Sequence, residues 1–274
     1  MAVTMADITK LRKMTGAGMM DCKNALTEAN GDFDGAMKII REKGQAVAAK
    51  RSDREASEGC VLAKAENGFG AMIALKCETD FVAKNEDFIK LTQDILDAAI
   101  ANKCKTLDEV KALPMGTGTI ADAVTDRSGI TGEKMELDGY ATVEGTAISV
   151  YNHQGKNFLC TMVALNKEVN PTVGHEVAMQ IAAMSPIAID EKDVPADVLE
   201  KEKEIAADKA RQEGKPENMI EKIAMGRIGK FYKEVCLLKQ EYIQDGKMTV
   251  ADFLKSQDKD LTVTAFKRFT LRAE

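Results

Sequence analysis

Apolar residues in the first part of the chain recur at the three- and four-residue spacing of amphipathic helices. Three such groups lie within residues 7–44, and the pattern predicts three short helices. Residues 15–18 and 30–32 separate them, because glycine can end a helix and Asp32 can cap the next one. The sequence therefore predicts an N-terminal three-helix domain, followed by a charged linker and a domain boundary near residue 55.

After residue 58 the pattern changes to short apolar runs that are separated by turn residues. Residues 60–63 and 71–75 flank Asn67 and Gly68, a dipeptide that favours the turn of a β-hairpin. The apolar residues that follow share one face of a predicted helix: Phe88, Leu91, Ile95, Leu96 and Ala99. This segment is predicted to be a hairpin followed by a helix.

The same order of elements recurs later in the chain. Residues 147–151 and 158–165 are predicted strands, residues 152–155 are the turn between them, and the helix that follows carries Val177, Ile181 and Met184. Two interpretations stay open, a degenerate internal duplication and the chance similarity of two common units. Either one gives two α+β subdomains.

A segment rich in charge, residues 191–222, still carries narrow apolar stripes, which include Ile205 and Ile220. Gly214 and Pro216 suit the end of one helix and the start of the next, so an antiparallel helical hairpin is predicted. A pair of solvated surface helices without a function is the alternative. A helix at 250–254 and a returning strand at 261–269 complete the predicted elements.

The predicted fold class is therefore α+β, with a three-helix domain, two related hairpin-plus-helix core subdomains and a projecting helical hairpin. The predicted domains are residues 1–55 (three-helix domain and linker), 56–140 (first core subdomain) and 141–274 (second core subdomain), the last interrupted by the hairpin at 190–235.

Composition narrows the function classes. The 274 residues carry 38 basic and 44 acidic side chains and a net charge of −6, which disfavours a general nucleic-acid-binding surface. No apolar run approaches the roughly 20 residues that span a bilayer, and we expect a cytoplasmic protein. The six cysteines show no C-x-x-C spacing and the two histidines no hydrolase motif, so we expect free thiols, no metal site, no cofactor and no catalytic residue.

Residues 116–121 match the G-x-G-x-x-A form of a dinucleotide fingerprint, but no buried strand precedes them and no βαβ series surrounds them. We interpret them as a linker and expect no binding of NAD.

Residues 79–84 follow the second predicted strand. Local patterns favour Thr79 or Asp80 as a helix cap and Phe81 as a core residue. The alternative is a loop tip at which Phe81 and Asp80 enter a metal and phosphate site of another protein. Met19 and Met20 are adjacent and cannot share one helix face, so at least one of them is expected to be exposed.

Three segments carry a resemblance to a known family: residues 11–23 (Leu-Arg-Lys-Met-Thr-Gly-Ala-Gly-Met-Met-Asp-Cys-Lys), 25–32 (Ala-Leu-Thr-Glu-Ala-Asn-Gly-Asp) and 79–84 (Thr-Asp-Phe-Val-Ala-Lys). Through these three segments the chain resembles translation elongation factor Ts, and the resemblance extends over nearly its whole length. The resemblance implies a UBA-like three-helix domain and a guanine nucleotide exchange factor that binds elongation factor Tu, with or without GDP, and performs no covalent chemistry.

The resemblance also implies site residues. It assigns displacement of the partner's Mg²⁺ to residues of one segment: Thr79, Asp80, Phe81, Val82, Ala83 and Lys84. It assigns contact with the partner to Arg12, Met19, Met20, Lys23 and His153. There are two departures from the family pattern. Residues 130–134 match a family loop only at Gly132 and Glu133 and are not assigned to the site, and the C-terminal helical module of some longer members is expected to be absent.

Two further points stay open at this stage. No direct contact with nucleic acid or membrane is expected, whereas a homodimer or a 2:2 complex with the partner remains an alternative to a simple pair. The competing function is a helical adaptor without exchange activity, in which the three-helix domain and residues 50–54 bind a protein or an RNA; RNA binding would weaken steeply with salt.

Overall fold

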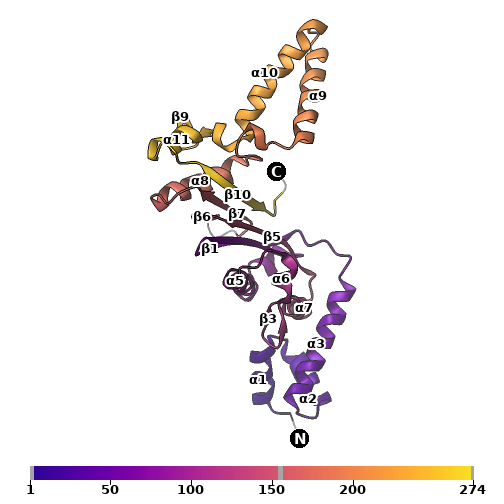
Figure 1. Cartoon of the computed structure of the whole chain (residues 1–274). Coiled ribbons are helices and arrows are strands. Elements are labelled where there is room, and N and C mark those ends of the chain that lie inside the picture. Colours follow the sequence, from indigo (N-terminus) through magenta and orange to yellow (C-terminus); the bar gives the residue numbers. More distant parts are fainter. Residues whose placement is uncertain (1–2, 154–156, 273–274) are drawn as a thin grey trace. The chain divides into compact units, whose positions relative to one another are not determined.

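The computed structural model describes residues 3–153 and 157–272 (Figure 1). Its contacts divide the chain into two compact units, of which the first comprises the described parts of residues 1–62, 72–141 and 270–274 and the second comprises residues 63–71 and 142–269. Helices and antiparallel strand pairs occur together, so the predicted α+β class is confirmed. Within the described ranges, no helix is both long enough and apolar enough to span a membrane.

The first unit begins with three helices, α1 (Met5–Thr15), α2 (Met19–Glu28) and α3 (Phe33–Lys50). Thr4 and Asp7 form a capping box at the start of α1, and Asp32 caps α3 as predicted. Their shared core consists of Ile8, Leu11, Ala17, Cys22, Ala25, Leu26 and Ala36. The three helices lie where the spacing of apolar residues predicts them. The proposed UBA-like character and the boundaries at residues 55 and 140 stay predictions.

A three-stranded sheet follows, with the order β1-β2-β5. β1 (Glu58–Glu66) and β2 (Phe69–Cys77) are joined by Asn67 and Gly68, whose φ angles of 50° and 74° match the turn that the dipeptide predicts. β5 (Met135–Glu144) is not predicted from the sequence, although its apolar and polar residues alternate, because Gly139 and the acidic residues of this segment have low β propensity.

Several helices connect β2 to β5. They are α4 (Asp80–Ala83), α5 (Glu86–Ala101), α6 (Leu107–Ala112) and α7 (Ile120–Thr131). The two-residue strands β3 (Pro114–Met115) and β4 (Gly118–Thr119) pair as a small hairpin between α6 and α7. The buried face of α5 includes four of the five residues predicted for it, and Leu91 is half-buried.

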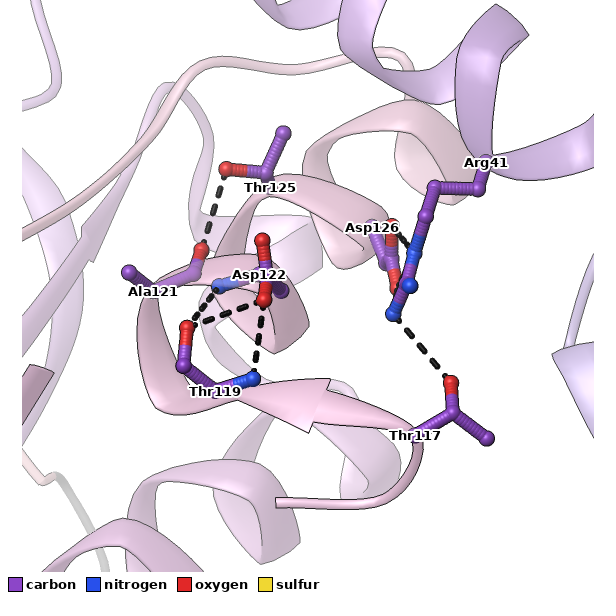
Figure 2. Close-up of polar contacts among 7 residues, drawn as sticks. All are labelled: Arg41, Thr117, Thr119, Ala121, Asp122, Thr125 and Asp126. Carbon is purple, nitrogen blue, oxygen red and sulfur yellow. Dashed lines mark hydrogen bonds and ion pairs between the residues drawn. The ribbon is translucent and has the colours of Figure 1, made fainter. Parts of the chain in front are cut away.

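The start of α7 corrects the interpretation of residues 116–121 as a linker. Thr119 Oγ1 accepts the N–H of Asp122 (3.2 Å), and Asp122 Oδ2 accepts the N–H of Thr119 (2.8 Å), which together form a capping box (Figure 2). The Thr-x-x-Asp spacing is the sequence signal for this helix start. The linker interpretation is therefore wrong from residue 118 onward.

Helix α7 packs against α3 within the first unit. The Arg41 guanidinium of α3 lies 3.2 Å from Asp126 Oδ2 of α7 and donates from Nη2 to Thr117 Oγ1 at 3.2 Å (Figure 2). One turn further along each helix, the backbones of Gly44 and Gly129 approach so closely that a Cβ added at Gly129 would overlap the Gly44 Cα atom. Gly44 is buried within α3, which continues beyond it to Lys50.

The second unit contains a sheet with the order β10-β7-β6. It is formed by β6 (Ala147–Asn152), β7 (Leu159–Leu165) and β10 (Val263–Thr270), and α8 (Pro171–Met184) follows β7. In both sheets the second strand of the hairpin is central, so the two hairpin-plus-helix patterns have the same topology. Half of the turn predicted at 152–155, residues 154 and 155, lies outside the described residues, and Asn152 is the last residue of β6. Met184 is 42% exposed, so its predicted place on the buried stripe is wrong; it is the last residue of α8.

The remaining elements of the second unit are mostly helical. α9 (Ala196–Gln212) and α10 (Glu217–Val235) pack against each other, with Ala206, Ala210, Ile220, Ala224 and Ile228 buried. Ile205, assigned from the sequence to the same stripe, is 36% exposed instead. The chain continues through the short 3₁₀ turns Glu191–Asp193 and Leu237–Lys239, β8 (Glu241–Tyr242), β9 (Asp245–Thr249) and α11 (Val250–Gln257).

The close approach of α3 and α7 leads to a prediction about stability. We expect Gly129→Ala to lower the free energy of unfolding by about 1–3 kcal/mol, because the new methyl group must push two packed backbones apart. Gly44→Ala is the matched control: its Cβ would lie 3.4 Å from Gly129 Cα, and the helix propensity of alanine offsets the tighter contact. Thermal and urea unfolding measure both variants, and equal losses would contradict the proposed asymmetry.

Candidate functional site

Residues 79–84 form a single exposed turn between β2 and α5. Thr79 caps the four-residue helix α4 by accepting the N–H of Val82 at 3.4 Å. Ala83 is buried and Val82 is half-buried, so this end of the turn rests on the protein. The prediction that Thr79 is a cap is confirmed.

Phe81 does not lie in the core. Its side chain is 84% exposed, more than any other large apolar side chain in the described part of the chain. Leaving a phenylalanine in water rather than burying it forgoes about 2 kcal/mol of stability. The interpretation of Phe81 as a core residue is therefore wrong, and the alternative of a loop-tip aromatic is the one that its exposure favours.

Asp80 and Lys84 form an ion pair on the surface of the same turn, with 2.6 Å between Asp80 Oδ2 and Lys84 Nζ. The hydrogen bond from Lys84 holds the pKa of Asp80 below its ordinary value, so the carboxylate is ionised at neutral pH. Both side chains are well exposed, and such a pair contributes little to stability. A partner can therefore recruit the Asp80 carboxylate at small cost.

The turn is anchored by residues to which the sequence assigned no role. Glu133, just after α7, accepts the hydroxyl of Thr79 at 2.6 Å and the N–H of Thr79 at 3.1 Å. Glu78, the residue before Thr79, accepts the N–H of Lys134 at 2.6 Å and forms an ion pair with Arg51 at 3.0 Å. The N–H of Lys134, assisted by Arg51, lowers the pKa of Glu78. The partial match at Gly132 and Glu133 was the only sequence signal for this contact.

The predicted contact residues of the three-helix domain lie on the surface of α1 and α2. Met19 and Met20 are 41% and 64% exposed, so both of these adjacent residues face water. Arg12, in the last turn of α1, and Lys23, on α2, are exposed as well. Exposed methionines are flexible and polarizable, which suits an adaptable protein interface. The assignment of these residues to a partner contact stays a prediction.

His153 belongs to the second unit, at the end of β6. Its Nδ1 lies 3.0 Å from the Tyr151 hydroxyl, and its ring meets that of Phe158 edge-on at 5.6 Å. His153 is thus half-buried in an aromatic cluster, in the connection between β6 and β7. Its predicted role in partner contact is untested.

Cysteine, histidine and acidic side chains are the groups that thiol or metal chemistry would use. Residues 3–153 and 157–272 contain no group of three or more His, Cys, Asp or Glu side chains that could hold a metal ion. All six cysteines are buried free thiols, and burial raises the pKa of Cys60 to about 11 and that of Cys77 to about 12. Thiols with such pKa values stay protonated and are poor nucleophiles.

The glycine pattern at residues 116–121 has a structural cause. A Cβ at Gly118 would lie 2.6 Å from Asp122 Oδ2 and 3.1 Å from Arg41 Nη2, so the protein itself occupies the space beside this glycine. In a dinucleotide site that space belongs to the pyrophosphate. The strand before α7 is also part of a two-residue antiparallel hairpin and not of a parallel sheet.

Comparison with known proteins gives a consistent result. Residues 78–273 match the family model described as "Elongation factor TS". The chain is 60% identical to an elongation factor Ts of Phocaeicola vulgatus and 59% identical to one of Bacteroides fragilis, each over 330 aligned positions. It is 54% identical to an elongation factor Ts of Porphyromonas gingivalis over 275 positions, and all three alignments cover the whole of both chains. The chain therefore belongs to the elongation factor Ts family.

Proposed function

We propose that this protein is a guanine nucleotide exchange factor for elongation factor Tu in the cytoplasm, and that it promotes release of GDP without covalent chemistry. The observation that carries the proposal is the exposed Phe81, next to the Asp80 carboxylate, in a chain whose relatives are elongation factors Ts. An exposed aromatic residue on a fixed turn is a typical centre of a protein interface. Asp80 supplies a negative charge beside it.

The proposed mechanism is thermodynamic linkage. If the protein binds nucleotide-free elongation factor Tu more tightly than the GDP-bound form, it must weaken the binding of GDP by the same factor. Exchange then requires a shape and a charge directed at the partner's Mg²⁺ and phosphate region, and no reactive group of its own. Phe81 would enter as an apolar wedge, and the Asp80 carboxylate would compete electrostatically for the metal.

The other predicted residues would widen this contact. Arg12, Met19, Met20 and Lys23 present a mixed basic and methionine surface that suits the partner's nucleotide-binding domain. His153 would contribute a second contact from the other unit. We propose one partner molecule as the basic arrangement, with the homodimer and the 2:2 complex as alternatives that sedimentation distinguishes.

One prediction of this mechanism concerns Phe81. With elongation factor Tu loaded with fluorescent GDP, we expect the wild-type protein to accelerate release and Phe81→Ala to lose at least about thirtyfold of that acceleration, as truncation of a central interface residue does. Because the Phe81 side chain is 84% exposed, the variant should have the same thermal unfolding midpoint as the wild-type protein.

Ile243→Ala is the matched control for this experiment, since Ile243 is an exposed apolar residue of the β8–β9 turn. With this variant, elongation factor Tu should release GDP as fast as with the wild-type protein. If the wild-type protein does not accelerate release at micromolar concentration, the proposed function is refuted, and a Phe81→Ala variant as fast as the wild type would refute the wedge.

A further prediction of this mechanism concerns the charge of Asp80. Asp80→Asn keeps the size of the side chain and removes its charge, so we expect slower release of GDP from the complex if the carboxylate acts near the partner's metal. Asp94→Asn is a close control, because Asp94 also pairs with a lysine four residues away (2.8 Å) and is 46% exposed, against 48% for Asp80. Equal rates for the two variants in a stopped-flow assay would contradict a role for the Asp80 charge.

A further inference from the structure

The exposed turn is held from both ends by one neighbouring segment. Beyond its own ion pair and cap, the turn between Thr79 and Asn85 is bonded to residues of α7 and of its exit. We infer that Glu133 is a positioning residue, which together with Arg127 keeps Phe81 and Asp80 oriented for partner binding before the partner arrives. The role in exchange rests on the proposed function, whereas the role in holding the turn does not.

The first anchor is at the beginning of the turn. The two oxygens of the Glu133 carboxylate accept the hydroxyl and the N–H of Thr79, so one side chain fixes both the side chain and the backbone of the cap. Hydrogen bonds to a charged acceptor are stronger than those between neutral groups. The reciprocal bond from the N–H of Lys134 to Glu78 joins the same two segments a second time.

The second anchor is at the end of the turn. Arg127 Nη2 donates to Asn85 Oδ1 at 2.8 Å and lies 3.4 Å from Asp87 Oδ2. Asn85 Oδ1 also accepts the N–H groups of Asp87 and Phe88, so it is the cap of α5. The Arg127 side chain is only 12% exposed, whereas Asp87 is 76% exposed, so a largely buried guanidinium holds partners that lie at the surface.

The anchoring residues are themselves held in place. Ser128 donates its hydroxyl to the carbonyl of Glu133 at 2.6 Å, and the N–H of Glu133 points to Thr131 Oγ1 at 3.3 Å. Gly132, with a φ of 72°, ends α7 and turns the chain so that Glu133 faces Thr79. Glu133 is therefore attached to the rigid end of a helix and not to a free loop.

These anchors determine whether the turn loses its conformational entropy during folding or during partner binding. A free loop that carries Phe81 would lose conformational entropy on binding, and this loss would weaken the complex. A turn that is ordered during folding has already lost that entropy. Glu133 thus acts on the partner through Thr79 and does not need to touch it.

The test uses the absence of tryptophan from the sequence. Phe81→Trp gives the full-length protein a single tryptophan at the tip of the turn, which can be excited selectively in the presence of the 4 tyrosines. In that background we expect Glu133→Gln to lower the fluorescence anisotropy by about a third, which is the difference between a rigid and a flexible site. Glu136→Gln is the control: Glu136 pairs with the side chain of Lys134 at 3.6 Å, and its loss should leave the anisotropy unchanged.

The second arm measures exchange with Phe81 intact. Glu133→Gln should slow GDP release from elongation factor Tu about tenfold, as expected for lost hydrogen bonds to a charged group. Thr79→Val removes one of the two hydrogen bonds to Glu133 and also the cap of α4, so it should slow GDP release as well. Thermal unfolding midpoints within about 2 °C of the wild type show that the variants are folded.

The outcomes separate the two proposals. If Glu133→Gln leaves the anisotropy of the Phe81→Trp protein unchanged, the positioning role is refuted, whatever the exchange rates are. If the anisotropy falls and exchange does not slow, the turn is held by Glu133 but its order does not serve the partner, and the inference is overturned. If the wild-type protein fails to accelerate exchange, the proposed function fails, and the anisotropy arm still decides the positioning role.

Discussion

Holding an aromatic side chain in water, at a fixed place, is the constraint on which the first unit depends. Phe81 gains nothing from the core, so its position must be maintained by polar contacts of its neighbours. Thr79 and Asn85, one on each side of the turn, receive these contacts from Glu133 and Arg127. Helix α7 therefore has two tasks: it packs against α3 on one side and orients the exposed turn on the other.

The packing of α3 on α7 is part of the same constraint. Two glycines allow the helix backbones to approach, and Arg41 joins the helices through Asp126. Because Arg51 lies just after the end of α3 and pairs with Glu78, the position of α3 also bears on the segment before the turn. Packing in the interior of the unit is thus connected with the surface that we propose as the contact site.

Elements with a strong local pattern could be predicted from the sequence. The three N-terminal helices have regular spacing and caps, and the first hairpin has Asn67 and Gly68 at its turn. β5 and α7 were missed for different reasons. β5 alternates apolar and polar residues but contains Gly139 and acidic residues, which have low β propensity. α7 is short of apolar residues, although Thr119 and Asp122 mark its start. The exposure of Ile205 and Met184 likewise depends on which neighbours pack nearby, which spacing alone does not determine.

In the candidate site, too, some features could be predicted from the sequence and others could not. Motif resemblance selected Asp80 and Phe81, but local patterns favoured a buried Phe81, since an apolar residue after a helix cap usually packs inward. The contact between Thr79 and Glu133 joins residues that are far apart in the chain, and no local pattern encodes a hydrogen bond of that kind. The tertiary contacts that support the site could therefore not be predicted from the sequence.

The shared topology of the two sheets has a consequence of its own. In the first unit, residues 78–85 separate the central strand from the next long helix, and they include the whole exposed turn. In the second unit, residues 166–170 make the corresponding connection, and α8 begins directly at Pro171. The same scaffold is thus present twice, but only one copy has the longer connection. A fold with two equivalent connections can elaborate one of them into a recognition element while the other preserves the packing, so new contacts arise without disturbing the sheets.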